Sequence, residues 1–153
     1  MQKKRRMLWV LFGLYAAVML VLLFNRTPHD NGLGYWQQMA ANLNLVPFRT
    51  IREFIDLLIY RRNPNLISHA VINLFGNIAV FVPLGVFLPA LWPRLRSWKA
   101  VMLCSAAIIT CIELTQLFTL RGSCDIDDLI LNLLGIAIGF ALWRIWKRIH
   151  HEN

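Results

Sequence analysis

Four long apolar segments constrain this chain more than any other feature of its sequence. They cover residues 7–24, 70–92, 100–120 and 126–146 of the 153-residue chain. Each is long enough for an α-helix to cross the hydrocarbon core of a bilayer, which takes about 20 residues. We therefore predict an all-α integral membrane protein, in which a bundle of four membrane-spanning helices forms a single domain over residues 1–153.

The composition supports a membrane environment. The chain is 58% hydrophobic and only 16% charged, whereas a soluble domain is nearer half apolar and a quarter charged. A net charge of +8 would suit a nucleic-acid-binding protein, but the basic residues flank the apolar segments instead of lining one polar face. We interpret them as signals of membrane topology, with the lipid bilayer as partner, and expect no nucleic acid to bind.

The distribution of Lys and Arg predicts the orientation. The first apolar segment follows KKRR and precedes NRTPHDNG, which contains no small-x-small cleavage site, so we expect an uncleaved signal anchor. With four spans, both termini and the second connection share one side, which holds ten cations and one acid, Glu152. The other side has six Arg and six acids. The positive-inside rule places both termini in the cytoplasm and turns connections 25–69 and 121–128 outward.

The long outer connection contains two candidate helices. Residues 34–45 suit a short surface helix. Residues 50–62 carry apolar side chains at helical spacing, namely Ile51, Phe54, Ile55, Leu58 and Ile59. Most charged residues of this segment fall elsewhere on the helix. This pattern predicts an amphipathic helix that lies on the membrane surface, packs over the outer end of the bundle, or does both.

Polar side chains of three predicted spans fall into one layer near the outer surface. At 1.5 Å per residue, the layer lies about 3–12 Å below the outer edge. Spacings of three or four residues place each pair on one helix face. The layer holds Asn73 and Asn77 of the second span, Glu113 and Gln116 of the third, and Asp128 and Asn132 of the fourth.

Glu113 is the member of this layer that most needs a partner. An ionisable side chain inside a membrane costs at least about 2.5–3.5 kcal/mol unless it is paired or hydrated. Arg121 is the nearest candidate partner in sequence, and the asparagines can donate hydrogen bonds. We predict a polar pocket between the second, third and fourth spans that opens outward.

Three interpretations of this pocket belong to different classes. In a binding site, Arg121 pairs with an anionic head group while the carboxylates take cationic or hydroxyl groups. In a hydrolase or transferase, Glu113 acts as acid and base, and a divalent cation, Mg²⁺ or Ca²⁺, is held by Asp125, Asp127 and Asp128. In a structural protein, the amides join helices and the acids cap them. We assign no nucleophile and expect no cofactor besides that cation.

The fourth span also contains the spacing Gly135-x-x-x-Gly139. Two small residues four apart allow helices to approach closely. This spacing fits packing within one chain or between two copies, so the sequence leaves a homo-oligomer open. The cysteines Cys104, Cys111 and Cys124 match no metal-binding motif.

Four motifs together carry a resemblance to a known family. They are NLVPFRTI (44–51), NLFGNIAVFVPLGVFLP (73–89), IELTQ (112–116) and RGSCDIDDLILNLLG (121–135). In this order and spacing the chain resembles the VanZ-like membrane proteins over about residues 44–139. The resemblance implies a small multi-pass protein of the bacterial plasma membrane. The recurring polar positions of the family fall on Asn73, Asn77, Glu113, Gln116, Arg121, Asp125, Asp128 and Asn132.

The founding member of that family is associated with resistance to the glycopeptide antibiotic teicoplanin. We therefore expect an envelope protein whose pocket binds a cell-wall lipid or a lipid-anchored glycopeptide. Teicoplanin fits this expectation because it carries an acyl chain and acts on the outer face of the membrane. The alternatives are a metal-assisted hydrolase or transferase acting on lipid-linked cell-wall intermediates, and a non-catalytic structural protein.

Overall fold

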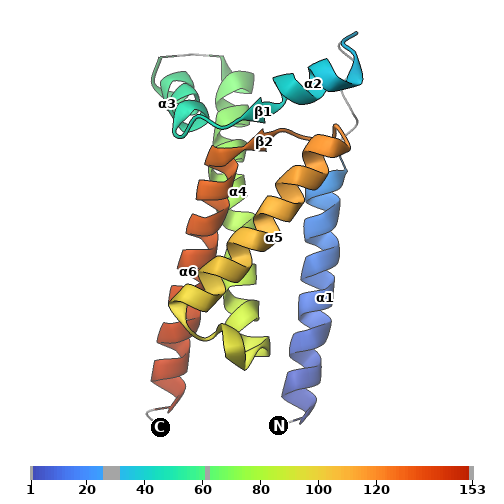
Figure 1. Ribbon diagram of the computed structural model, residues 1–153. Coiled ribbons are helices and arrows are strands. Elements are labelled where there is room, and N and C mark those ends of the chain that lie inside the picture. The colour runs from blue at the N-terminus through green and yellow to red at the C-terminus, as the bar shows by residue number, and fades with distance from the viewer. Residues whose placement is uncertain (1, 26–31, 61–62, 152–153) are drawn as a thin grey trace.

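The computed structural model describes residues 2–25, 32–60 and 63–151 and is dominated by helices (Figure 1). Four of them are long and apolar enough to cross a membrane: α1 (Gln2–Phe24), α4 (Pro64–Leu91), α5 (Trp98–Phe118) and α6 (Ile126–His151). This confirms the predicted all-α membrane fold. Both described ends of the chain lie at the same end of the bundle (Figure 1).

Local capping signals set where two of the long helices begin. The side chain of Asn63 accepts a hydrogen bond from the Asn65 amide at 3.0 Å. Pro64 then takes the first helical position, where its missing N–H costs nothing. Helix α4 therefore starts well before residue 70. Ser97 likewise caps α5 by accepting from the Ala100 amide at 3.2 Å.

Helices α4 and α6 pack closely because three glycines line their contact. A Cβ built on Gly139 would lie 2.0 Å from the backbone oxygen of Val82, and one on Gly135 would lie 2.2 Å from that of Ile78. Gly85 of α4 has equally little space for a side chain, because a Cβ built there would lie 2.3 Å from the backbone oxygen of Ile136. The small-residue spacing thus packs α6 against α4 within one chain.

Helix α1 is peripheral to this pair. Met19 is its buried residue. The Tyr15 hydroxyl donates to the Val80 oxygen of α4 at 2.8 Å, and the Trp9 ring meets Trp92 edge to face at 5.0 Å. Many large apolar side chains on the long helices are exposed, for example Leu14 at 62% and Leu103 at 74%. Such an apolar exterior is what a bilayer accommodates.

The described part of the connection between α1 and α4 forms a layer at the end of the bundle opposite the termini, which we call the outer end after the predicted orientation (Figure 1). It contains α2 (Tyr35–Ala41), β1 (Leu43–Asn44) and α3 (Arg49–Tyr60). Strand β1 pairs in parallel with β2 (Cys124–Asp125), with Leu43 opposite Cys124. The Tyr35 hydroxyl donates to the Phe118 oxygen at 2.8 Å, which ties α2 to the end of α5. After α4, a 3-10 turn, η1 (Pro93–Leu95), leads into α5.

Of the two predicted arrangements of the amphipathic helix α3, the structure shows its packing over the end of the bundle, and contact with the membrane surface stays a prediction. The helix packs against α4, where the Phe54 and His69 rings meet at 5.9 Å. At the same time Ile55, Ile59 and Tyr60 are exposed. An apolar face exposed at this level suits a helix in contact with the membrane surface.

Candidate functional site

Asp125 is the centre of the polar cluster at the outer end. It is 6% exposed. Its Oδ2 accepts from the Thr50 hydroxyl at 2.6 Å and from Nδ2 of Asn44 at 3.2 Å. Its Oδ1 accepts from the Asp127 amide at 2.8 Å. Each carboxylate oxygen therefore has a donor, as burial of an acid requires.

Glu113 reaches the same cluster from α5. It is 5% exposed, and its Oε2 accepts a long hydrogen bond of 3.4 Å from the Asp125 amide. Two buried acids thus lie next to each other, one on a membrane-spanning helix and one on β2. The sequence named both as candidate ligand-binding residues, with Asp125 in the loop before the fourth span, and the structure brings the two residues together.

Asp127 stabilises the start of α3 through its carboxylate. It is fully buried, at 0% exposure. Its Oδ1 accepts from the Phe48 amide, and its Oδ2 accepts from the Ile51 amide at 3.1 Å. Phe48 has φ 62°, a left-handed conformation that non-glycine residues rarely adopt. The carboxylate therefore caps α3 from a distant helix and holds the turn that precedes it.

Asp128 faces α4 from the first turn of α6, and Asn132 follows one turn later. The Asn77 side-chain amide donates to Oδ1 of Asp128, so one predicted contact between the second and fourth spans is present. Asn132 is 2% exposed, and its Oδ1 has no hydrogen-bond donor among the described residues. A buried carbonyl in that position favours any donor that reaches it.

Three other predicted site residues lie elsewhere. Nε2 of the buried Gln116 donates to the Leu23 oxygen at 2.8 Å, and Nη1 of Arg121 donates to the Phe24 oxygen at 2.9 Å. Both therefore fasten the outer end of α1. Asn73 donates to the His69 oxygen at 2.9 Å, within its own helix. The polar residues of the predicted layer thus make several separate contacts and do not line one pocket.

A cavity of about 300 Å³ opens beside the two buried acids. Glu113, Cys124 and Asp125 line one side of it, although nearly all of its accessible surface is apolar. Its other walls are mainly apolar: Leu43, Leu45, Thr110, Leu114, Ile126 and Leu129. Helix α5, the start of α6 and β1 therefore enclose a small apolar space with carboxylates at one side. We call this space the outer groove.

The surroundings of the outer groove change the pKa of the Cys124 thiol. Burial raises the pKa of this thiol, and the neighbouring carboxylates Glu113, Asp125 and Asp128 raise it further. Both effects disfavour a thiolate, so Cys124 is not an activated nucleophile.

The three aspartates do not converge as ligands of one ion. Asp125 accepts from Thr50, Asp127 from the start of α3, and Asp128 from Asn77. In the part of the chain that the structure describes, no group of three His, Cys, Asp or Glu side chains is placed to hold a metal. The arrangement gives the divalent-cation hypothesis no geometric support.

Sequence reasoning missed two members of the cluster, Asn44 and Thr50. Both stand in the NLVPFRTI motif that carries part of the family resemblance. Asn44 also donates to the Thr50 hydroxyl at 3.0 Å, so the two side chains form one unit over Asp125. That motif was the available signal, because neither residue belongs to a membrane span.

The fold and site define a small helical membrane protein with four spans and a buried acidic cluster at one end. A model of the VanZ/LLP1 family matches residues 12–147, and the chain belongs to this family. The match confirms the resemblance drawn from the motifs. No curated protein and no solved structure matches the chain.

Proposed function

We propose that this VanZ-like protein binds an amphipathic ligand of the bacterial cell envelope in the outer groove. The observation that carries the proposal is the placement of Glu113 and Asp125, two buried carboxylates, in the wall of an otherwise mainly apolar cavity. Apolar walls favour an acyl chain, and carboxylates favour hydroxyl, amide or ammonium donors. A ligand with both features matches the outer groove.

The size of the outer groove limits which part of a ligand enters. About 300 Å³ is at the small end of ligand pockets. One chain with its adjoining polar group fits, while a large head group stays outside. A glycopeptide that carries an acyl chain, such as teicoplanin, meets this description, and so does a cell-wall lipid.

The location of the site rests on the predicted orientation. In a plasma membrane with both termini cytoplasmic, the outer groove lies at the level of the outer leaflet. A ligand that is anchored there by its acyl chain would reach the groove without crossing the membrane. Capture of such an antibiotic away from its target would then contribute to glycopeptide resistance.

A binding titration with teicoplanin tests the proposal. Purified protein in mild detergent is compared with Glu113→Gln, which removes a charge with little change of shape. Loss of a hydrogen bond to a charged group should weaken binding by about tenfold or more. The matched control is Glu53→Gln, because Glu53 lies on α3 at the same end and is 62% exposed.

Three results would count against the proposal. They are equal binding by wild type and Glu113→Gln, an equal loss in Glu53→Gln, and equal binding of a glycopeptide without an acyl chain. A purely structural role for Glu113 would instead lower the thermal stability of Glu113→Gln and leave its affinity unchanged.

A further inference from the structure

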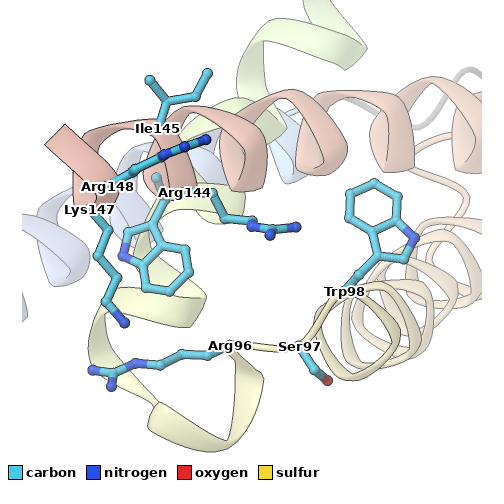
Figure 2. Close-up of a pocket in the computed structure, with 8 residues that line it drawn as sticks. Arg96, Ser97, Trp98, Arg144, Ile145, Lys147 and Arg148 are labelled. Carbon is cyan, nitrogen blue, oxygen red and sulfur yellow. The ribbon is translucent and has the colours of Figure 1, made fainter.

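A second cavity lies at the opposite end of the bundle, between the last turns of α6 and the turn that joins α4 to α5 (Figure 2). Its volume is about 790 Å³. Four cations and two tryptophans dominate its lining: Arg96, Arg144, Lys147, Arg148, Trp98 and Trp143. We call it the basic pocket. It shares no residue with the outer groove.

The basic side chains come from two separate segments. Figure 2 shows Lys147 extending from α6 toward the turn that carries Arg96, whereas Arg144 extends from α6 in the direction of Trp98. Nε of Arg96 donates to the Pro89 oxygen at 3.3 Å, which holds this side chain at the end of α4. Nζ of Lys147 lies 5.5 Å from the Trp143 ring centre. Arg96, Arg144 and Lys147 therefore border one pocket from two separate segments of the chain.

No described carboxylate neutralises this end of the molecule. The acids that the structure describes all lie toward the outer end, on α3, α5, β2 and the first turn of α6 (Figure 1): Glu53, Asp56, Glu113, Asp125, Asp127 and Asp128. Arg96, Arg144 and Lys147 line the same pocket, and like charges this close repel one another, so a bound anion relieves that repulsion.

The surroundings of the basic pocket favour a lipid over a soluble anion. Trp98 is 48% exposed where the apolar helix α5 begins, a position typical of tryptophan at the membrane interface. On α6, Ile145, Trp146 and Ile149 are exposed beside the pocket. Phosphate groups of lipids lie at this depth, and these apolar side chains offer a surface for acyl chains.

We propose that the basic pocket binds the phosphate of an anionic phospholipid in the leaflet that faces the termini. Arg96 and Arg144 donate to the phosphate oxygens from opposite sides, since guanidinium groups suit phosphate geometry. Basic pockets between helices at the cytoplasmic side of membrane proteins recognise anionic head groups in this way. The site does not depend on the ligand of the outer groove.

The test compares lipid binding by the purified full chain in detergent. Short-chain phosphatidylglycerol should bind about tenfold tighter than phosphatidylcholine of the same chain length. The double variant Arg96→Gln, Arg144→Gln should lose this preference. The control Lys3→Gln, Lys4→Gln should keep it, because it removes the same charge at the same end of the bundle outside the pocket.

Equal binding of the two lipids, or an equal loss in both double variants, would overturn the proposal. Displacement of phosphatidylglycerol by equimolar inorganic phosphate would also overturn it, because the pocket would then be a soluble-anion site. A second measurement leaves the charges intact. Phosphatidylglycerol with brominated chains should quench wild-type tryptophan fluorescence more than brominated phosphatidylcholine, and Trp98→Phe should reduce the difference. An unchanged difference in Trp98→Phe would contradict a lipid at this wall.

Discussion

At the scale of single residues, the buried acids of the outer end have distinct tasks. Asp125 gathers the side chains of Asn44 and Thr50, while Asp127 caps α3 with both of its oxygens. Glu113 faces the outer groove and contacts the Asp125 amide. Acids of two short motifs, IELTQ (112–116) and RGSCDIDDLILNLLG (121–135), thus serve assembly and, by our proposal, ligand binding.

Replacement of Asp127 tests its capping task. Asp127→Ala leaves two backbone amides without acceptors and should lower the free energy of unfolding by about 2 kcal/mol. Hydrogen exchange should accelerate at Phe48 and Ile51. The control Asp56→Ala removes an exposed acid of α3 and should change stability by less than about 0.5 kcal/mol. Equal effects of the two substitutions would contradict the cap.

At the scale of elements, the contact between α4 and α6 organises the bundle. Within a lipid bilayer the hydrophobic effect does not drive helices together, so their close packing depends on small residues. The same contact fixes the position of α6 along the axis of α4. It therefore places Asp128 within hydrogen-bonding distance of Asn77. The polar cluster therefore depends on glycines in the interior of the spans.

Replacement of glycine by alanine should affect stability differently at two positions. Gly139→Ala places a Cβ 2.0 Å from the Val82 oxygen and should destabilise the fold by about 1–3 kcal/mol. Gly13→Ala on α1 meets nothing within 4 Å and should be neutral or stabilise by up to about 1 kcal/mol. Reversible unfolding in mixed micelles measures both. Similar values would contradict close packing at Gly139.

At the scale of the whole molecule, the charges are divided between the ends of the bundle. The described acids gather at the end with α3 and β2, and the basic pocket lies at the end with the termini (Figure 1). The predicted orientation was drawn from the same Lys and Arg residues by the positive-inside rule, and it stays a prediction. The two proposed sites likewise lie at opposite ends of the bundle.

Cysteine labelling tests this orientation. A membrane-impermeant maleimide added outside intact cells should modify Cys124 and should not modify Cys104 or Cys111, which lie on α5 inside the membrane. Because the pKa of Cys124 is raised, its thiolate fraction is small at pH 7, and the rate should rise about tenfold per pH unit until the pKa is reached. Labelling of Cys124 only after permeabilisation would reverse the orientation.

Much of this architecture could be predicted from the sequence. Long apolar segments indicate the spans, and helical spacing places Asn77, Glu113 and Asp128 in one layer. The partners of Asp125 could not be found this way, because β1 and β2 pair residues that are far apart in the chain. Arg121 was expected near Glu113, but Leu120 has φ 53° and ends α5 in a turn after which Arg121 reaches α1.

The central claim is that the outer groove holds an amphipathic ligand through Glu113. Lipidomic mass spectrometry of protein purified in mild detergent measures this directly, because it identifies what occupies the site without prior choice of ligand. We predict an amphipathic envelope molecule that copurifies with wild type and with Glu53→Gln, and that is depleted about tenfold in Glu113→Gln. An identical set of copurified molecules in all three proteins would contradict the account.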